Sequence, residues 1–218
     1  MLGLALAVMT RERFLSLGET SGFTQTKTGI EIQYGLEKAA IDVIKQDLIR
    51  IRISRGGEFD DEPTFALAVD PFEPSTRVKF DVAFSCSETN GGWELTTKEL
   101  TISIQATGFE LNITRTDGTL VLQTGSAGNS PYYRHLNDTL VSRRAARASD
   151  AILGLGEKTG TANRRGRDFV LWNNDVLNPT SSGEFTASLD KSDPRADSTS
   201  VEFDPYYMSI PFFYHQDA

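Results

Sequence analysis

The sequence predicts an all-β fold, a sandwich of antiparallel strands. Three observations lead to this class. Apolar residues mostly recur at every second position, which is the period of a half-buried strand. Turn residues (Gly, Asn, Asp and Ser) separate these short runs at close spacing. Helical signal is weak, since the best helical stretch, 140–149, lacks a long apolar stripe and fits a loop equally well.

Alternating stretches supply the expected strands. In the first of them, Ile49, Ile51 and Ile53 alternate with Arg50 and Arg52, so the isoleucines share one face of a sheet. The same pattern returns further along the chain. The alternating stretches are 49–53, 78–84, 101–105 and 109–114. We expect each to be a strand with one apolar face.

A hairpin is predicted after the last of these stretches. The pair Asp117-Gly118 separates it from Leu120 and Leu122. An Asp-Gly pair between alternating runs favours a two-residue turn in which both central residues have positive φ. Further on, the composition of 178–200 changes to Asn, Pro, Thr, Ser, Gly and Asp, which predicts a long exposed loop.

Composition narrows the class of protein and its partners. Hydrophobic residues make up 39% and charged residues 24% of the 218 residues, which is ordinary globular usage and argues against disordered, collagen-like and coiled-coil proteins. A net charge of -8 argues against a nucleic-acid partner. The apolar start of the chain, 2–9, has no basic region before it and is followed almost at once by Arg11, which argues against a cleaved signal peptide. It is also too short to span a membrane, which takes about 20 residues. The single cysteine, Cys86, cannot form an internal disulfide, so we expect a cytoplasmic protein.

No metal site and no cofactor are predicted. One cysteine and two histidines, His135 and His215, are too few for a structural zinc site. The acidic run of 58–62 lacks the spacing and glycine of a calcium loop, so we interpret it as solvated. A serine triad would need one of the two histidines, and the chain has no Gly-x-Ser-x-Gly elbow to support it.

A glycine-rich segment resembles a phosphate loop but does not fit one. It contains Gly154, Gly156 and Gly160, and a Walker loop would need glycine where Glu157 precedes Lys158. No βαβ unit surrounds it, so a dinucleotide site is also excluded. We expect these glycines to make tight turns at the end of a strand.

Four blocks in the last third of the chain resemble the N-terminal domain of glycoside hydrolase family 31, the α-glucosidase family. The blocks are, in order, 154–160 (GLGEKTG), 163–167 (NRRGR), 171–175 (LWNND) and 204–213 (DPYYMSIPFF). The resemblance implies a galactose-mutarotase-like β-sandwich, here residues 1–218, that packs against a separate catalytic (β/α)8 barrel. That barrel would follow Ala218 and would supply both catalytic carboxylates, because no family catalytic motif occurs in this chain. We therefore expect a fragment, possessing no catalytic residues, that is inactive alone and lacks the last strands of its sandwich.

The same resemblance implies the sugar-binding residues. The loop 172–175 would reach over the mouth of the barrel, where Asp175 would hydrogen-bond sugar hydroxyls, with Trp172 and Asn173 beside it. Two alternatives stay open, namely that Asp175 only caps a turn and that Trp172 anchors the loop by burial. The loop of 176–203 is longer than the usual family connection and would reshape the sugar site.

Other residues in the blocks are expected to be structural. Arg164, Arg165 and Arg167 would form ion pairs with the barrel or within the sandwich, and Glu157 and Lys158 would form an orienting pair. The stretch 206–213 is apolar at both alternating sets of positions, which predicts a strand buried on both faces, partly by the barrel.

The leading functional hypothesis is a barrel-supporting, substrate-contacting domain of an α-glucosidase-like hydrolase. Its partners would be an α-linked glucoside or oligosaccharide and the catalytic barrel of the same polypeptide. One alternative is a free-standing carbohydrate-binding or interaction module without enzyme activity. Another is a sugar mutarotase, which would need an acid and a base such as His135 and Glu157. The sequence fixes neither the sugar nor the oligomeric state.

Overall fold

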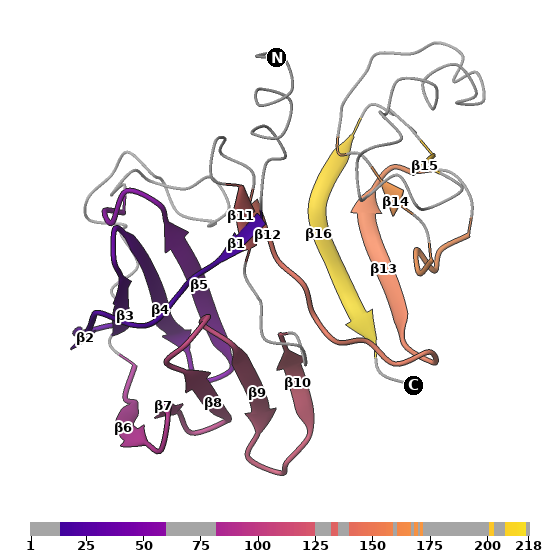
Figure 1. Ribbon diagram of the computed structural model, residues 1–218. Coiled ribbons are helices and arrows are strands. Elements are labelled where there is room, and N and C mark those ends of the chain that lie inside the picture. The colour runs from indigo at the N-terminus through magenta and orange to yellow at the C-terminus, as the bar shows by residue number, and fades with distance from the viewer. Residues whose placement is uncertain are drawn as a thin grey trace, which may run out of the picture. The chain divides into compact units, whose positions relative to one another are not determined.

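Strands are the regular elements of the described chain (Figure 1). The computed structural model describes residues 14–59, 82–124, 132–134, 140–158, 161–166, 168–169, 171, 201–202 and 208–216. The chain divides into two compact units, residues 1–145 and residues 146–218, and each is described by itself. No helix in the described ranges is long and apolar enough to cross a membrane.

One antiparallel sheet of the first unit follows the chain order. Its strands are β2 (Gly22–Gln25), β3 (Gly29–Tyr34), β4 (Glu37–Lys45) and β5 (Leu48–Ser54). The predicted strand over 49–53 is confirmed as β5, in which Ile51 lies opposite Ile41 of β4. On the outer face, Asp42 of β4 accepts hydrogen bonds from the guanidinium groups of Arg50 (3.0 Å) and Arg52 (2.9 Å), which compensates the burial of its charge.

The second sheet also has only antiparallel neighbours, in the order β10-β9-β8-β7-β6. Its strands are β6 (Ser85–Thr89), β7 (Gly92–Thr96), β8 (Leu100–Gln105), β9 (Leu111–Arg115) and β10 (Leu120–Gln123). The predicted strand over 101–105 is confirmed as β8. That over 109–114 begins later than expected, because Phe109 has a φ of 53° and stands in a turn before β9.

The strand predicted over 78–84 is wrong for residues 82–84, since β6 begins at Ser85, and residues 78–81 lie outside the described ranges. Its alternation is still informative. The side chains of Val82, Phe84 and Cys86 pack partly buried against the core.

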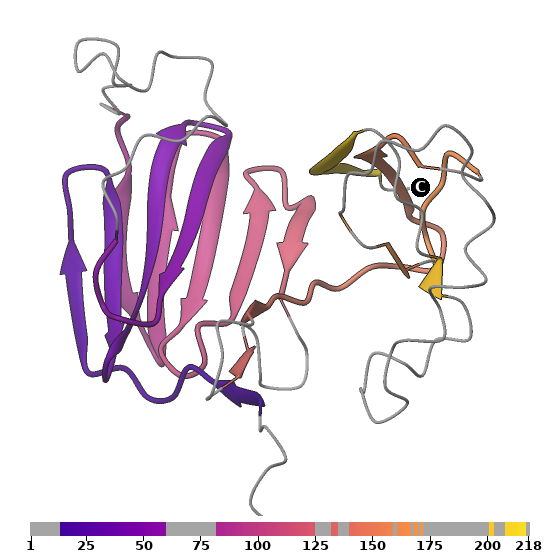
Figure 2. The same cartoon turned by 90° about the horizontal axis from the view of Figure 1, so that it is seen from above.

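The two sheets stack as layers with the apolar core between them (Figure 2). Core residues come from both sheets and from the loops beside them. They are Leu17, Ile30, Ile32, Tyr34, Ala39, Ile41, Val43, Leu95, Leu100, Ile102, Ile104, Phe109, Leu111 and Ile113. Each fully buried isoleucine among them stabilises the fold by roughly 1.5–3 kcal/mol. The predicted all-β antiparallel sandwich is confirmed.

The Asp117-Gly118 hairpin is confirmed, with a different turn from the one expected. Only Gly118 of the pair has a positive φ, 87°. The turn is closed by the Arg115 amide, which donates to the Thr119 carbonyl at 2.8 Å, and by the Gly118 amide, which donates to the Arg115 carbonyl at 2.9 Å. Asp117 Oδ1 accepts from the Thr119 amide at 2.8 Å, so Asp117 caps the turn with its side chain.

A small sheet completes the first unit. It has the order β1-β11-β12, formed by β1 (Phe14–Ser16), β11 (Tyr132–Arg134) and β12 (Leu140–Val141). Residues 142–149 form no helix, so of the two readings of 140–149 the loop is confirmed for that part.

The second unit is built on a two-stranded antiparallel sheet, β13 (Ala151–Gly156) with β16 (Ser209–Gln216). A short parallel pair joins β14 (Asp168–Phe169) to β15 (Val201–Glu202). The expected loop 176–203 therefore contains β15, whereas the rest of it, including 178–200, lies outside the described residues.

Of the strand predicted over 206–213, residues 209–213 belong to β16, whereas 206–207 lie outside the described residues. The described part of this chain does not provide the predicted burial, which was assigned partly to the barrel. Phe212 is 54% and Tyr214 66% exposed, and Met208 and Ile210 are exposed as well. Nothing in the described part of the chain covers these side chains. That residues 1–218 form one domain stays a prediction.

Candidate functional site

The predicted sugar-binding residues Trp172, Asn173 and Asp175 lie outside the described residues, and so do His135 and Arg167. Their nearest described neighbours in sequence are Leu171 and the short strand β14. The site is therefore built from the β13–β16 sheet and from residues 161–169, which together carry most of the first two sequence blocks.

The glycine-rich block forms a bulge in β13. The pairing of β13 with β16 shifts register between Gly154 and Gly156, and all three residues from 154 to 156 have positive φ. A Cβ atom on Gly154 would meet the Phe212 carbonyl oxygen at 2.6 Å, and one on Gly156 would meet that of Met208 at 2.6 Å. The tight turns predicted for these glycines are therefore wrong for Gly154 and Gly156, which form a bulge within the strand. Gly160 lies outside the described residues.

The second block runs along the other edge of β13. The Arg164 amide donates to the Ile152 carbonyl at 2.7 Å. Asn163 Oδ1 accepts from the amides of Ile152 and Arg165, both at 3.1 Å. These bonds fix the backbone of residues 163–165 beside the strand.

Arg164 and Arg165 differ in what their side chains do. The Arg164 guanidinium donates to the carbonyls of Thr161 (2.8 Å), Lys158 (3.2 Å) and Gly154 (3.4 Å), and lies 5.7 Å from the centre of the Phe169 ring. It therefore ties the loop to the strand. The half-buried Arg165 side chain makes no hydrogen bond and no ion pair with any residue that the structure describes. An ion pair predicted for Arg165 within the sandwich is thus not present there.

These elements line an open pocket of about 470 Å³, called here the Arg165 pocket. It is lined by Ile152, Leu155, Arg164, Arg165, Gly166, Phe169 and Phe213. The arginines were predicted to form ion pairs, but the pocket could not be predicted, because Ile152 and Phe213 come together only through the pairing of β13 with β16. The two glycines that flank Leu155 were the one local feature of the sequence that indicated unusual backbone beside this pocket.

The Glu157–Lys158 pair predicted from the sequence is wrong. Lys158 is only 9% exposed, and its amine donates to the Ser209 hydroxyl at 2.9 Å. Glu157 is exposed, and its amide donates to the Met208 carbonyl at 2.8 Å. Lys158 thus links the end of β13 to the start of β16. A mutarotase pairing of Glu157 with His135 stays a hypothesis.

An aspartate–histidine pair closes the opposite end of this sheet. Asp150 is 2% exposed, and its Oδ2 lies 2.8 Å from His215 Nε2 and accepts from the Arg147 amide at 2.7 Å. Arg147 Nε donates to Oδ1 at 3.1 Å. Burial by itself raises the pKa of Asp150, but the hydrogen bonds and charges of Arg147 and His215 outweigh it and hold that pKa below its ordinary value. Asp150 is therefore ionised at neutral pH and is not a proton donor. Its carboxylate connects Arg147 to His215 of β16.

No group of three or more His, Cys, Asp or Glu side chains that could hold a metal ion occurs among the described residues. Of the acidic run, Glu58 is exposed, and 60–62 lie outside those residues.

Comparison with known proteins gives a family match. The sequence model described as "Glycosyl hydrolase 31 N-terminal galactose mutarotase-like domain" matches residues 38–217. The galactose-mutarotase-like sandwich expected from the motifs is thereby confirmed. The match covers both compact units of the chain.

Individual relatives are much longer than this chain. Alpha-glucosidase 2 of Bacillus thermoamyloliquefaciens is 24% identical over 199 residues, which are 91% of this chain and 22% of that protein. A GH31 dextranase of Flavobacterium johnsoniae, solved with isomaltotriose, has a TM-score of 0.65 at 23% identity, covering 92% of this chain and 21% of its own. The cycloalternan-forming enzyme of Listeria monocytogenes, solved with a pentasaccharide substrate, has a TM-score of 0.62 at 16% identity, covering 93% and 17%. This chain thus spans about a fifth of the length of the relatives it matches.

Proposed function

Because this chain belongs to the family of glycoside hydrolase 31 N-terminal galactose mutarotase-like domains, we propose that it supports the catalytic barrel of an α-glucosidase-like enzyme and contacts its substrate. The observation that carries this proposal is the family match over residues 38–217, combined with coverage of only 22% of the curated relative. A domain that corresponds to 22% of its relative would form only a small part of such an enzyme, and the rest of the polypeptide would form the remainder.

The proposed ligand is an α-linked glucoside or oligosaccharide. The support comes from what similar proteins are named for, an alpha-glucosidase and a dextranase solved with isomaltotriose. We propose Asp175 as the principal contact of this chain with the sugar, with Trp172 and Asn173 beside it. A carboxylate accepts two hydroxyl hydrogen bonds at once, and such charge-assisted bonds are stronger than neutral ones.

The second partner is the catalytic barrel of the same polypeptide. Retaining hydrolysis uses two carboxyl groups about 5–5.5 Å apart, one as nucleophile and one as acid and base. The proposal assigns both to the barrel, and the chain alone is then inactive. The exposed apolar side chains of β16 support a larger neighbour for this domain.

Hydrolysis of a chromogenic α-glucoside by two proteins tests the proposal. One is the chain 1–218, and the other is the same chain extended through the rest of its reading frame. We expect only the extended protein to cleave the substrate. Turnover by residues 1–218 would contradict the assignment of the carboxylates, and binding of the glucoside without activity in either protein would favour a binding module.

Asp175→Ala in the extended protein tests the sugar contact. We expect kcat/KM to fall by about tenfold or more, because a charge-assisted hydrogen bond to the substrate is lost. Asp47→Ala is the matched control, since Asp47 is an exposed carboxylate in the turn between β4 and β5. Equal kinetics for both variants would remove Asp175 from the site.

Two further parts of the proposal concern the whole chain. The family match runs through both compact units, which supports residues 1–218 acting as one domain.

We propose the cytoplasm as the compartment, supported by the single cysteine and the absence of any possible internal disulfide. Cell fractionation with an antibody against this chain tests it, and recovery outside the cytoplasmic fraction would contradict it.

A further inference from the structure

The Arg165 pocket has the size and lining of a small-molecule site. Its volume of about 470 Å³ lies within the range of about 300–1,000 Å³ that is usual for ligand pockets. Two phenylalanine rings, Phe169 and Phe213, and two aliphatic side chains, Ile152 and Leu155, line it together with two guanidinium groups. Apolar walls with a few polar groups are typical of such sites.

Arg165 is the polar group with bonding capacity left over. The Arg164 guanidinium is occupied by three carbonyl oxygens, whereas that of Arg165 has no partner in the described chain. A guanidinium group has five N–H donors and no acceptor, in a planar fork that matches a carboxylate. The Arg165 amide donates to Asn163 Oδ1, and this bond fixes the backbone that carries the Arg165 side chain.

The pocket wall at Leu155 is strained. Leu155 has a φ of 70°, in the left-handed region that non-glycine residues avoid, and Gly154 and Gly156 on either side make the bulge possible. Backbone strain of this kind is found most often at ligand sites, where it holds a side chain in the position that binding needs. Here it accompanies the placement of the Leu155 side chain in the lining of the pocket.

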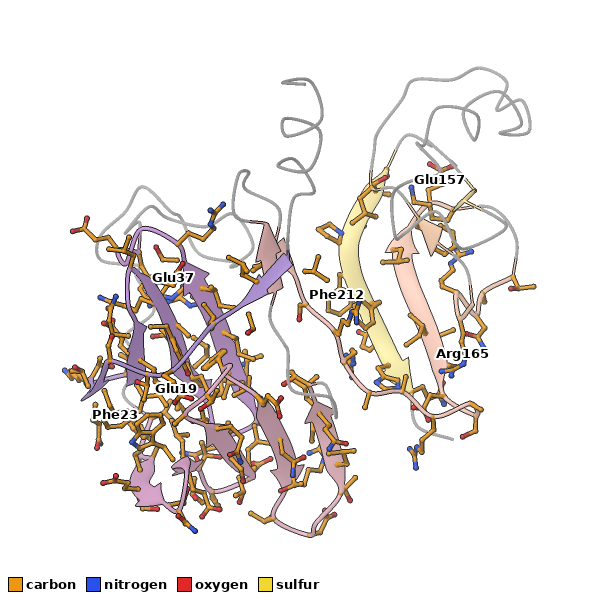
Figure 3. All side chains as sticks on the ribbon, in the orientation of Figure 1. Glu19, Phe23, Glu37, Glu157, Arg165 and Phe212 are labelled. Carbon is orange, nitrogen blue, oxygen red and sulfur yellow. The ribbon has the colours of Figure 1, made fainter. Side chains whose placement is uncertain are left out.

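The described lining favours an anionic ligand. None of the seven described lining residues has a carboxylate or amide side chain, so none of them supplies a side-chain acceptor for Arg165. Glu157, the acidic residue of the preceding sequence block, does not supply it either, because Glu157 and Arg165 lie near opposite ends of β13 (Figure 3). An anionic group is the strongest partner for a guanidinium group.

We propose that the Arg165 pocket binds an acidic sugar, a hexuronate unit whose carboxylate pairs with Arg165 while the apolar face of its ring contacts Phe169 and Phe213. The choice of a sugar rests on the proposed function, and the choice of an acid rests on the lining. The acidic unit bound at Arg165 would be recognised in addition to the neutral glucoside that the proposed function assigns to Asp175.

Titration of the isotope-labelled chain 1–218 by NMR tests the proposal through the Arg165 Nε–H signal. The probes are methyl α-D-glucuronide, methyl α-D-glucoside as the neutral ring, and acetate as the carboxylate without a ring. We expect saturable shifts with the glucuronide, and binding at least about tenfold weaker for the other two, because each lacks one of the two interactions. The affinity for the glucuronide should fall as salt is raised.

Arg165→Ala should abolish saturation, and Arg165→Lys should weaken binding, because an ammonium group keeps the charge without the planar fork. Arg115→Ala is the matched control, an exposed arginine in β9 outside the pocket. Backbone spectra that overlay outside residues 151–169 would show that the variants fold. The proposal is overturned by equal affinity for glucoside or acetate, by no saturation with the glucuronide, or by unchanged binding in Arg165→Ala.

These readouts do not depend on hydrolysis. Loss of activity in the extended protein would contradict the proposed function and leave the titration unaffected. Failure of the titration, with an active extended protein, would contradict only the acidic-sugar site.

Discussion

The hydroxyl of Tyr34 is buried in the core of the sandwich without a hydrogen-bond partner in the described chain. The ring packs edge-to-face against Phe109, with 6.3 Å between the ring centres. Burial raises the pKa of Tyr34, so the hydroxyl stays neutral, and leaving it unbonded costs roughly 1–3 kcal/mol. The ring therefore stabilises the core while its hydroxyl destabilises it.

Tyr34→Phe should accordingly stabilise the protein, by up to about 1 kcal/mol, because the ring contact stays and the unbonded hydroxyl is removed. Urea unfolding followed by circular dichroism measures the difference. Tyr34→Ala is the control, and it should destabilise by about 3–5 kcal/mol through the cavity that it leaves. A clear loss of stability in Tyr34→Phe would mean that the hydroxyl is bonded.

The contribution of Asp150 to the stability of the folded protein should depend on pH. Its pKa is lowered in the folded protein, so its contribution to stability is complete above the ordinary value of 3.8 and is lost as the pH falls through the lowered pKa. Asp150→Asn should therefore lower the Tm at pH 7, and the difference from wild type should shrink as the pH falls below 3.8. Thermal unfolding from pH 7 to pH 2 measures it. A difference independent of pH would show that charge is not involved.

Among the elements, β13 depends on its two glycines. Gly154 has a φ of 127°, and a Cβ atom there would come within 2.6 Å of the Phe212 carbonyl oxygen of β16. We expect Gly154→Ala to destabilise the β13–β16 sheet by on the order of 3 kcal/mol or more, since strain and a backbone clash add. The loss of the Phe212 and Phe213 amide signals from their folded positions is the direct readout.

A substitution at Gly118 separates the cost of backbone strain from the cost of the backbone clash. It also has a positive φ, 87°, but a Cβ atom there would meet nothing within 4 Å. Gly118→Ala should cost only the conformational part, roughly 1–2 kcal/mol. Equal costs for both substitutions would mean that β16 gives way and that the close approach at Gly154 is unimportant.

The strands that could be predicted are those with a local signal. The isoleucines of β5 alternate with arginines, and Asp117-Gly118 marks the hairpin, so neighbouring residues suffice to find both. The long strand β4 was missed, because five consecutive residues, 39–43, are buried and alternation disappears. One of them is Asp42, whose burial depends on Arg50 and Arg52 of another strand.

Less of the candidate site could be predicted, for a similar reason. The motifs located the right segments, 154–165, but not what their side chains contact. Lys158 bonds Ser209, and Asp150 bonds His215, each across more than fifty residues of sequence. Pairing of β13 with β16 creates these contacts, and sequence spacing does not determine such a pairing.

On the scale of the whole molecule, the apolar core belongs to one of the two compact units. Every buried hydrophobic residue in the described ranges lies between Leu17 and Ile113. The β13–β16 sheet instead exposes Phe212 and Tyr214, whose rings pack edge-to-face 5.0 Å apart. Since burial of apolar surface supplies most of the stability of a sheet, the second unit should open more easily than the first.

Hydrogen exchange of the chain 1–218 tests this difference. Hydrogen-bonded amides of β13 and β16 should exchange at least about tenfold faster than those of β3, β4 and β8, because opening exposes little additional apolar surface. In the extended protein, the β16 amides should become protected while those of β8 stay unchanged, if the catalytic part covers Phe212 and Tyr214. Phe212→Ser should remove that gain without affecting β8. Equal protection of both units in the short chain would show that the β13–β16 sheet is stable without a partner, and the exposed side chains would then need no larger neighbour.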